Sequence, residues 1–187
     1  MKINIPTALT LLRIALIPLL ILIFYLPLPG SRTFCALIFM VAGFSDWLDG
    51  YLARKLDLTS RFGAFLDPVA DKLIVVAALV VLLQENPSIF FVISTVVIIG
   101  REITVSALRE WMAEIGQRTN VAVSYIGKIK TAVQMLAITL MLYHSEIAGI
   151  SAYTAGLYTL YLSVILTLWS MAQYLMAAWP ALRDEEA

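Results

Sequence analysis

Residues 45–72 read SDWLDGYLARKLDLTSRFGAFLDPVADK and carry five aspartates, of which Asp57 stands alone and four form two pairs: Asp46 with Asp49, and Asp67 with Asp71. The first two are three residues apart and the last two are four apart, and these spacings place each pair on one face of an α-helix. Only a short charged segment separates the pairs, so we expect two antiparallel helices whose acidic faces meet. This stretch therefore predicts a helical hairpin with a carboxylate cluster at one end.

On either side of this stretch the chain is too apolar for an ordinary soluble domain. Of its 187 residues, 61% are hydrophobic and only 14% are charged, and the mean hydropathy is +0.89. A helix needs ~20 apolar residues to cross a bilayer, and six stretches qualify: residues 7–26, 33–54, 64–83, 89–111, 121–143 and 152–178. No stretch alternates like a membrane β-strand, and no linker interrupts the chain. We predict an all-α integral membrane protein, a six-transmembrane-helix bundle formed by one domain of residues 1–187.

The distribution of basic residues predicts the orientation of this bundle. The apolar run at the N-terminus contains Arg13 and lacks a following cleavage site, so we interpret it as the first membrane helix. Cytoplasmic loops hold an excess of Lys and Arg, and with both termini on one side only Arg32 falls on the other. We therefore expect both termini to be cytoplasmic. The basic residues on or near that side are Lys2, Arg54, Lys55, Arg61, Lys72, Arg101, Arg109, Arg118, Lys128, Lys130 and Arg183.

The four aspartates predict a metal site. Converging carboxylates repel one another unless a positive charge lies between them, and a hard cation with oxygen ligands is the natural occupant. Mg²⁺ is the first choice and Mn²⁺ the second, and four carboxylates are enough for two ions. Gly50 and Gly63 would let the backbone approach a ligand, and Arg54 could hold a phosphate. The alternatives are solvated charges at helix ends and, for Arg54, a residue snorkelling to the membrane boundary.

Eight residues of this stretch form the pattern D-x2-D-G-x2-A-R-x8-G-x3-D-x3-D, which resembles the signature of the CDP-alcohol phosphotransferase family. The resemblance implies six transmembrane helices, a homodimer, CDP-diacylglycerol or a CDP-alcohol as donor, and Mg²⁺ or Mn²⁺ as cofactor. It implies that all four aspartates bind metal and that Asp71 also takes the proton from the acceptor. It further suggests that CDP-diacylglycerol is bound by Thr7, Thr10, Gly50, Ala53, Arg54, Ser60 and Gly63. The alternative for the two threonines is that they cap the start of a helix.

The resemblance extends along most of the chain, through NIPTALTLLRIALIP, RFGAFLDPVADK, GREITVSALREWMAEIG and VAVSYIGKIKTAVQM. These segments resemble the bacterial members that transfer the phosphatidyl group of CDP-diacylglycerol to sn-glycerol 3-phosphate, giving phosphatidylglycerophosphate and CMP. The implied location is the bacterial cytoplasmic (inner) membrane, with membrane lipid around the chain and the active site facing the cytoplasm. For the acceptor phosphate we expect Arg101, Lys128 and Lys130. The alternatives are a buried Arg101 pair with Glu102 or an aspartate, and ordinary flanking charge for the two lysines.

Three other interpretations remain open at this stage. The same chemistry could use another acceptor, such as serine, inositol phosphate or phosphatidylglycerol. A cation transporter would also contain intramembrane carboxylates, although its acidic groups should be spread through the bilayer depth. A structural scaffold would not need so many ionisable groups. The net charge of zero gives no indication of nucleic acid, and none is expected as a partner. Cys35 is expected to be a small core residue.

Overall fold

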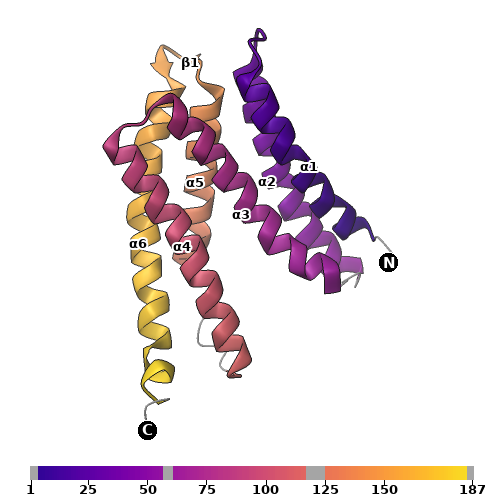
Figure 1. The fold of residues 1–187 in the computed structure, drawn as a ribbon, viewed down its shortest axis with the longest axis vertical. Helices are drawn as coiled ribbons and strands as arrows, with labels where there is room; N and C mark the ends of the chain where they lie inside the picture. Colours follow the sequence, from indigo (N-terminus) through magenta and orange to yellow (C-terminus); the bar gives the residue numbers. More distant parts are fainter. Residues whose placement is uncertain (1–3, 57–60, 117–124, 185–187) are drawn as a thin grey trace. The chain divides into compact units, whose positions relative to one another are not determined.

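The computed structural model describes residues 4–56, 61–116 and 125–184, which form six helices and one short hairpin (Figure 1). The helices are α1 (Ile5–Tyr25), α2 (Ser31–Leu56), α3 (Arg61–Glu85), α4 (Ile89–Glu114), α5 (Tyr125–Tyr143) and α6 (Ala152–Asp184). Strands β1 (Glu146–Ile147) and β2 (Ile150–Ser151) lie between α5 and α6. Each of the six predicted stretches overlaps one helix, so the all-α fold class is confirmed.

The helix bounds and the hairpin depart from the prediction in detail. Helix α3 begins at Arg61 and α6 continues to Asp184, because amphipathic ends extend a helix beyond its apolar part. The first residues of the predicted fifth stretch, 121–124, lie outside the described residues. The hairpin turns at Ala148 and Gly149, which have φ of 52° and 80°. Two positive φ values fit a tight hairpin turn, but Ala lacks the Asn or Asp signal that would have predicted it.

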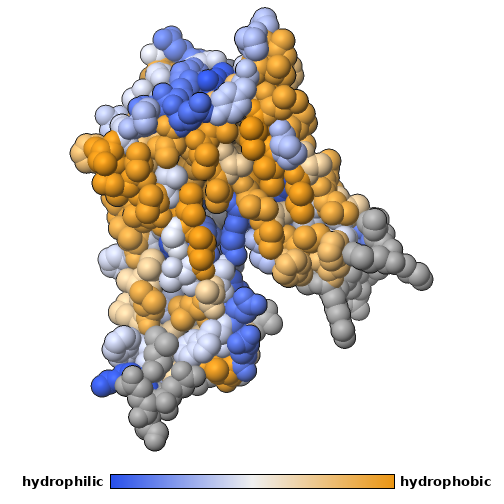
Figure 2. Space-filling model, viewed as in Figure 1, coloured by the Kyte–Doolittle hydropathy of each residue, from blue (hydrophilic) through white to orange (hydrophobic). Residues whose placement is uncertain are grey.

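Four helices in the described part of the chain are long and apolar enough to cross a membrane: Pro6–Tyr25, Ile89–Glu114, Ile126–Tyr143 and Ala152–Ala181. Helices α2 and α3, which carry the aspartates, are not among them, so six spans and the orientation stay predictions. Large apolar side chains point outwards, and Figure 2 shows hydrophobic residues over much of the visible surface along the helices. Phe44, Phe65, Phe90, Ile165 and Trp169 are each more than 60% exposed. A surface of this kind is suited to lipid, so the chain is an all-α membrane protein.

One compact unit contains α1, α2 and α3 together with residues 138–156. Helix α1 packs against both α2 and α3, and the Sγ of Cys35 in α2 lies 3.7 Å from the carbonyl oxygen of Leu20 in α1. Cys35 is buried and unoxidised, which confirms its expected place in the core. At one end of this unit Arg32 pairs with Glu85 at 2.9 Å. The other end holds the aspartates.

The second compact unit contains α4 with residues 88–137 and 157–187 of the chain. Helices α4 and α6 run in the same direction, because Arg101 contacts Ser170 and, further along both helices, Met112 packs in one cluster with Ala178. The remaining members of that cluster are Val105, Leu108, Trp111, Tyr174 and Ala181. Several hydroxyls are also buried in this unit, and Ser163 and Thr167 satisfy theirs on carbonyl groups of their own helix.

Candidate active site

The start of α1 places three polar side chains on one buried face. Asn4 caps the helix by accepting a hydrogen bond of 3.0 Å from the backbone N–H of Thr7, and Pro6 lies in the first turn, where a missing N–H costs nothing. Thr7, Thr10 and Arg13 then follow at intervals of three residues and are exposed by 3%, 2% and 0%. The capped start of α1 therefore directs Thr10 towards α3, and Arg13 towards both α2 and α3.

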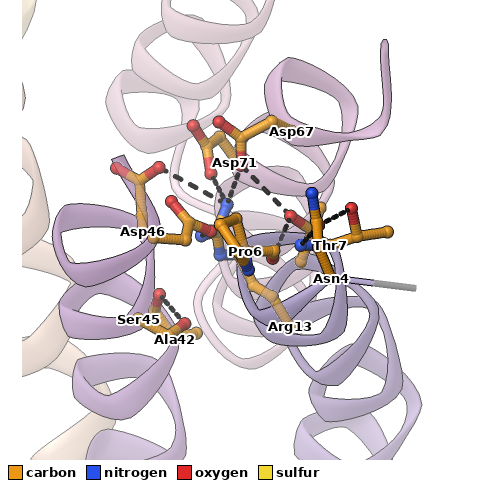
Figure 3. A network of polar contacts seen from close by, with 11 residues as sticks. Asn4, Pro6, Thr7, Arg13, Ala42, Ser45, Asp46, Asp67 and Asp71 are labelled. Carbon is orange, nitrogen blue, oxygen red and sulfur yellow. Dashed lines mark hydrogen bonds and ion pairs between the residues drawn. The ribbon is translucent and has the colours of Figure 1, made fainter. Parts of the chain in front are cut away.

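The Arg13 guanidinium lies among all four aspartates (Figure 3). Its Nη2 donates to Asp49 Oδ2 at 2.6 Å, and both side chains are buried. Its Nη1 lies 3.4 Å from Asp46 Oδ1 and 3.3 Å from Asp67 Oδ1, and it also donates to Asp71 Oδ1. The two acidic helix faces thus meet as their spacing predicted, with α1 supplying a cation between them.

The geometry and chemistry of the cluster fit a hard divalent ion. One carboxylate oxygen from each of Asp46, Asp49 and Asp67 lies within 4.8 Å of the other two. Mg²⁺ holds oxygen ligands at ~2.0–2.1 Å and keeps several waters, so three oxygens this close can share one ion. Asp49 is buried, whereas the side chains of Asp46 and Asp67 are 45% and 37% exposed. The cluster therefore has a fixed buried ligand and an open side through which an ion and its waters can enter.

Asp71 is the fourth aspartate of the cluster and lies beside that group of three oxygens. Its side chain is 38% exposed and it accepts a hydrogen bond from Arg13. It lies one helical turn beyond Asp67 on α3 and faces the same guanidinium (Figure 3). An accessible carboxylate beside a candidate metal site is placed where an acceptor hydroxyl could reach it.

Thr10, one of the residues expected to bind the nucleotide, contacts the cluster. Its hydroxyl is 3.5 Å from Asp67 Oδ1 and 3.2 Å from the carbonyl oxygen of Pro6, whereas the Thr7 hydroxyl donates to Asn4 Oδ1. Gly63 lies in the first turn of α3 and is half-buried. The backbones of Gly50, Ala53 and Arg54 belong to α2, but the structure does not describe the side chains there, and Ser60 lies outside the described residues. The nucleotide-binding set as a whole stays a prediction.

A second polar cluster lies in the unit that contains α4. Glu102 Oε1 accepts from Arg101 Nη1 at 3.3 Å and from Lys130 Nζ, while Arg101 Nη2 donates to Ser170 Oγ at 3.1 Å. The side chain of Lys130 is only 1% exposed. Lys128 is exposed, and it makes no ion pair with the described residues. The structure thus brings Arg101 and Lys130 together around Glu102. These are two of the three cations that were expected to bind the acceptor phosphate.

Arg13 is a central residue that sequence reasoning did not assign to a site, and Glu102 was named only as an alternative partner of Arg101, a pair that the structure does form at 3.3 Å. Each carried a signal, because a charge within an apolar span is expensive unless it is paired. Arg13 also lies three residues beyond Thr10, on the face that the threonines share. Glu102 directly follows Arg101, and neighbours in a helix point in different directions, so its role between two cations required the packing of α5 against α4.

The family model described as CDP-alcohol phosphatidyltransferase matches residues 3–172, which is most of the chain. The chain belongs to the CDP-alcohol phosphatidyltransferase family. The matched region contains every aspartate of the cluster as well as Arg13, Glu102 and Lys130. The resemblance seen in residues 45–72 is therefore confirmed, and the chain is an enzyme of a transferase family.

Curated relatives within this family resemble the chain along almost its whole length. A CDP-diacylglycerol–glycerol-3-phosphate 3-phosphatidyltransferase of Haemophilus influenzae is 51% identical over 188 residues, covering 98% of each chain. Proteins of the same name are 52% identical in Pectobacterium atrosepticum, over 95% of this chain and 96% of the relative, and 49% identical in Escherichia coli K12, over 99% and 100%. The chain and these relatives are therefore of nearly the same length.

Proposed function

We propose that the protein transfers the phosphatidyl group of CDP-diacylglycerol to sn-glycerol 3-phosphate, producing phosphatidylglycerophosphate and CMP. The observation that carries this proposal is identity of about half over nearly the full length with three transferases named for that reaction. The carboxylate cluster around Arg13 supports the phosphate-transfer chemistry, and the buried cations Arg101 and Lys130 support an acceptor that carries a phosphate.

The aspartates divide between metal binding and proton transfer. Asp46, Asp49 and Asp67 would hold a divalent ion through the three oxygens that converge, and Asp71 would complete a site for two ions, Mg²⁺ or Mn²⁺. When bound, the ions would supply positive charge that stabilises the diphosphate leaving group. Thr10, beside Asp67, would contact the nucleotide end of the donor. The other residues that would bind the donor are Thr7, Gly50, Ala53, Arg54, Ser60 and Gly63.

The reaction is a direct displacement in which Asp71 serves as the general base. The acceptor hydroxyl oxygen forms a bond to the lipid-side phosphorus, the bond from that phosphorus to the CMP oxygen breaks, and the hydroxyl proton passes to the Asp71 carboxylate. A carboxylate can take this role only within hydrogen-bond reach of the acceptor oxygen, and the exposed side chain of Asp71 leaves it open to that oxygen. No Cys, His or Ser of residues 45–72 is needed as a covalent nucleophile.

The acceptor phosphate would be held by Arg101 and Lys130, with Lys128 as a third cation. Arg101 is oriented by Ser170 and by the Tyr174 ring, whose centroid lies 5.6 Å from the guanidinium carbon. Fixing a guanidinium in this way prepares it for the two-pronged contact that phosphate favours. Because Glu102 neutralises both cations in the absence of substrate, the phosphate would take over contacts that the carboxylate now makes.

The setting of this reaction is the bacterial cytoplasmic membrane. We propose six membrane spans formed by one functional domain, with both termini and the aspartate cluster on the cytoplasmic side, and assembly as a homodimer. Support comes from the excess of Lys and Arg on one side of the predicted bundle and from the apolar surface of the helices. Water-soluble glycerol phosphate and CMP would enter and leave from that side, while CDP-diacylglycerol would reach the site through the lipid.

A reconstitution assay tests the proposal. The purified protein is incubated with CDP-diacylglycerol, Mg²⁺ and labelled sn-glycerol 3-phosphate, serine, inositol phosphate or phosphatidylglycerol in parallel, and the lipid products are identified by mass spectrometry. We expect phosphatidylglycerophosphate and stoichiometric CMP from glycerol phosphate alone. A product from one of the other acceptors would replace the acceptor assignment, and absence of any product with all four would refute the proposed activity.

A further inference from the structure

We propose that Arg13 is a positioning residue that occupies the carboxylate cluster before metal binds and competes with the metal for the same oxygens. This inference rests on the proposed function in one respect, namely that the cluster is a metal site. It assigns Arg13 a task separate from binding either substrate: it holds the four aspartates together in the metal-free protein and lowers their affinity for the ion.

The competition follows from which atoms the guanidinium contacts. Its two terminal nitrogens reach all three residues whose oxygens converge within 4.8 Å of one another. A divalent ion bound by these residues would approach the same lone pairs to ~2.0–2.1 Å, and its charge would repel the guanidinium. Nη1 therefore cannot keep its contacts with Asp46 and Asp67 once the ion is in place.

The positioning role follows from the helices that the guanidinium joins. Asp46 and Asp49 lie in the second half of α2, Asp67 and Asp71 lie in the first half of α3, and Arg13 reaches both pairs from α1. Without a cation the four carboxylates would push these helices apart. Arginine stays charged at any physiological pH, so it maintains the convergence whenever no metal is bound.

The exchange between the two cations has a structural route. The side chains of Asp46, Asp67 and Asp71 are each more than a third exposed, so an ion can arrive from the open side of the cluster. On the buried side Nη2 and Asp49 Oδ2, at 2.6 Å, can stay together while Nη1 withdraws. The Arg13 Nε–H has no acceptor among the described residues, so the present arrangement of the guanidinium is not a fully satisfied one that would resist change.

The experiment measures Mn²⁺ binding to the full-length protein in detergent without substrates, using electron paramagnetic resonance to quantify free Mn²⁺. Arg13→Gln removes the competing charge, and Arg32→Gln is the matched control, because Arg32 is also an ion-paired arginine of the same unit but lies at the end away from the aspartates. We expect the Mn²⁺ dissociation constant of R13Q to fall about tenfold or more, equivalent to about 1.4 kcal/mol, and that of R32Q to match the wild type. Equal or weaker Mn²⁺ binding by R13Q would overturn the proposal.

A second measurement keeps the test decisive if R13Q unfolds without metal. Arg13→Lys retains the charge but has a single ammonium that cannot span the same oxygens, so we expect Mn²⁺ to bind more tightly than to wild type, by a smaller factor than for R13Q. In chelator, both variants should unfold at a lower temperature than wild type, and saturating Mn²⁺ should raise their unfolding temperatures more. If Arg13 had only a structural role, replacing it would not tighten Mn²⁺ binding. A Mn²⁺ affinity of R13K equal to or below that of wild type would therefore refute competition between Arg13 and the metal.

These outcomes are separable from those of the transferase assay. Tighter Mn²⁺ binding by R13Q together with no lipid product would leave the role of Arg13 standing and reject the proposed activity. Phosphatidylglycerophosphate formation together with unchanged Mn²⁺ affinity in R13Q would do the reverse.

Discussion

Replacement of Lys130 by Met tests whether the buried cations of the α4 unit hold the acceptor phosphate. Met has a similar length and fills the buried space, and Glu102 keeps Arg101 as a partner, so the substitution leaves no buried charge alone. A hydrogen bond to a charged group contributes ~1.5–3 kcal/mol, which corresponds to roughly 10- to 150-fold in a binding constant. Because Glu102 already neutralises Lys130 and the phosphate must displace it, we expect the lower end, an increase of about tenfold in KM for glycerol 3-phosphate.

The control is Lys128→Met, two residues away on the same helix but exposed. Both variants are assayed at saturating CDP-diacylglycerol with varied glycerol 3-phosphate, and then with the two substrates exchanged. A phosphate contact made in both the ground and transition states raises the acceptor KM with little change in kcat, so K130M should show that split and K128M a smaller effect. The reasoning would be refuted by a normal acceptor KM in K130M, or by equal losses for donor and acceptor.

Three further outcomes follow from the aspartate cluster and the helices. Asp67→Asn should abolish turnover in a phosphatidyl-transfer assay while the protein stays folded, because the metal site loses a charged ligand. Excess chelator should abolish turnover of the wild type in the same assay, and full activity in chelator would contradict the metal requirement. Asp71→Asn should lower kcat by ~10² or more through loss of the base, and a normal rate would place the base elsewhere. A thiol reagent that cannot cross membranes should label Asn86→Cys only from outside the cell, and a tag at either terminus should be reached only from the cytoplasm; reversed labelling would discard the orientation.

The acidic site could be predicted from sequence because its geometry is local. Pairs three and four residues apart on helices joined by a short segment have few ways to arrange their side chains, and the structure brings Asp46, Asp49 and Asp67 together accordingly. The contacts of Arg13 with these aspartates could not be predicted in the same way. Its partners lie on two other helices, and the choice among them depends on how α1 packs, which the spacing along α1 does not specify.

The cluster of Arg101, Lys130 and Glu102 shows the same division between local and tertiary information. Arg101 and Lys130 were candidates because a charge in an apolar span needs a partner, and they do meet, through Glu102. Lys128 has the same charge and nearly the same position in the sequence, yet it is exposed, because two residues along a helix turn a side chain by more than half of a circle. Which of two nearby lysines faces inwards is decided by the register of α5 against α4.

The burial of Arg13 also has a consequence for the order in which the protein is built. Its partners Asp49, Asp67 and Asp71 follow it in the chain by 36, 54 and 58 residues. At ~5–20 residues per second of synthesis, the last of them is made about 3 to 12 s after Arg13. Until Asp49 is made, 36 residues after Arg13, α1 carries in the bilayer a guanidinium that costs ~2.5–3.5 kcal/mol near a helix centre, and its mean hydropathy of 2.4 provides the compensating apolar surface. The pair of α1 and α2 is therefore complete as two helices before Arg13 can reach the aspartates of α3.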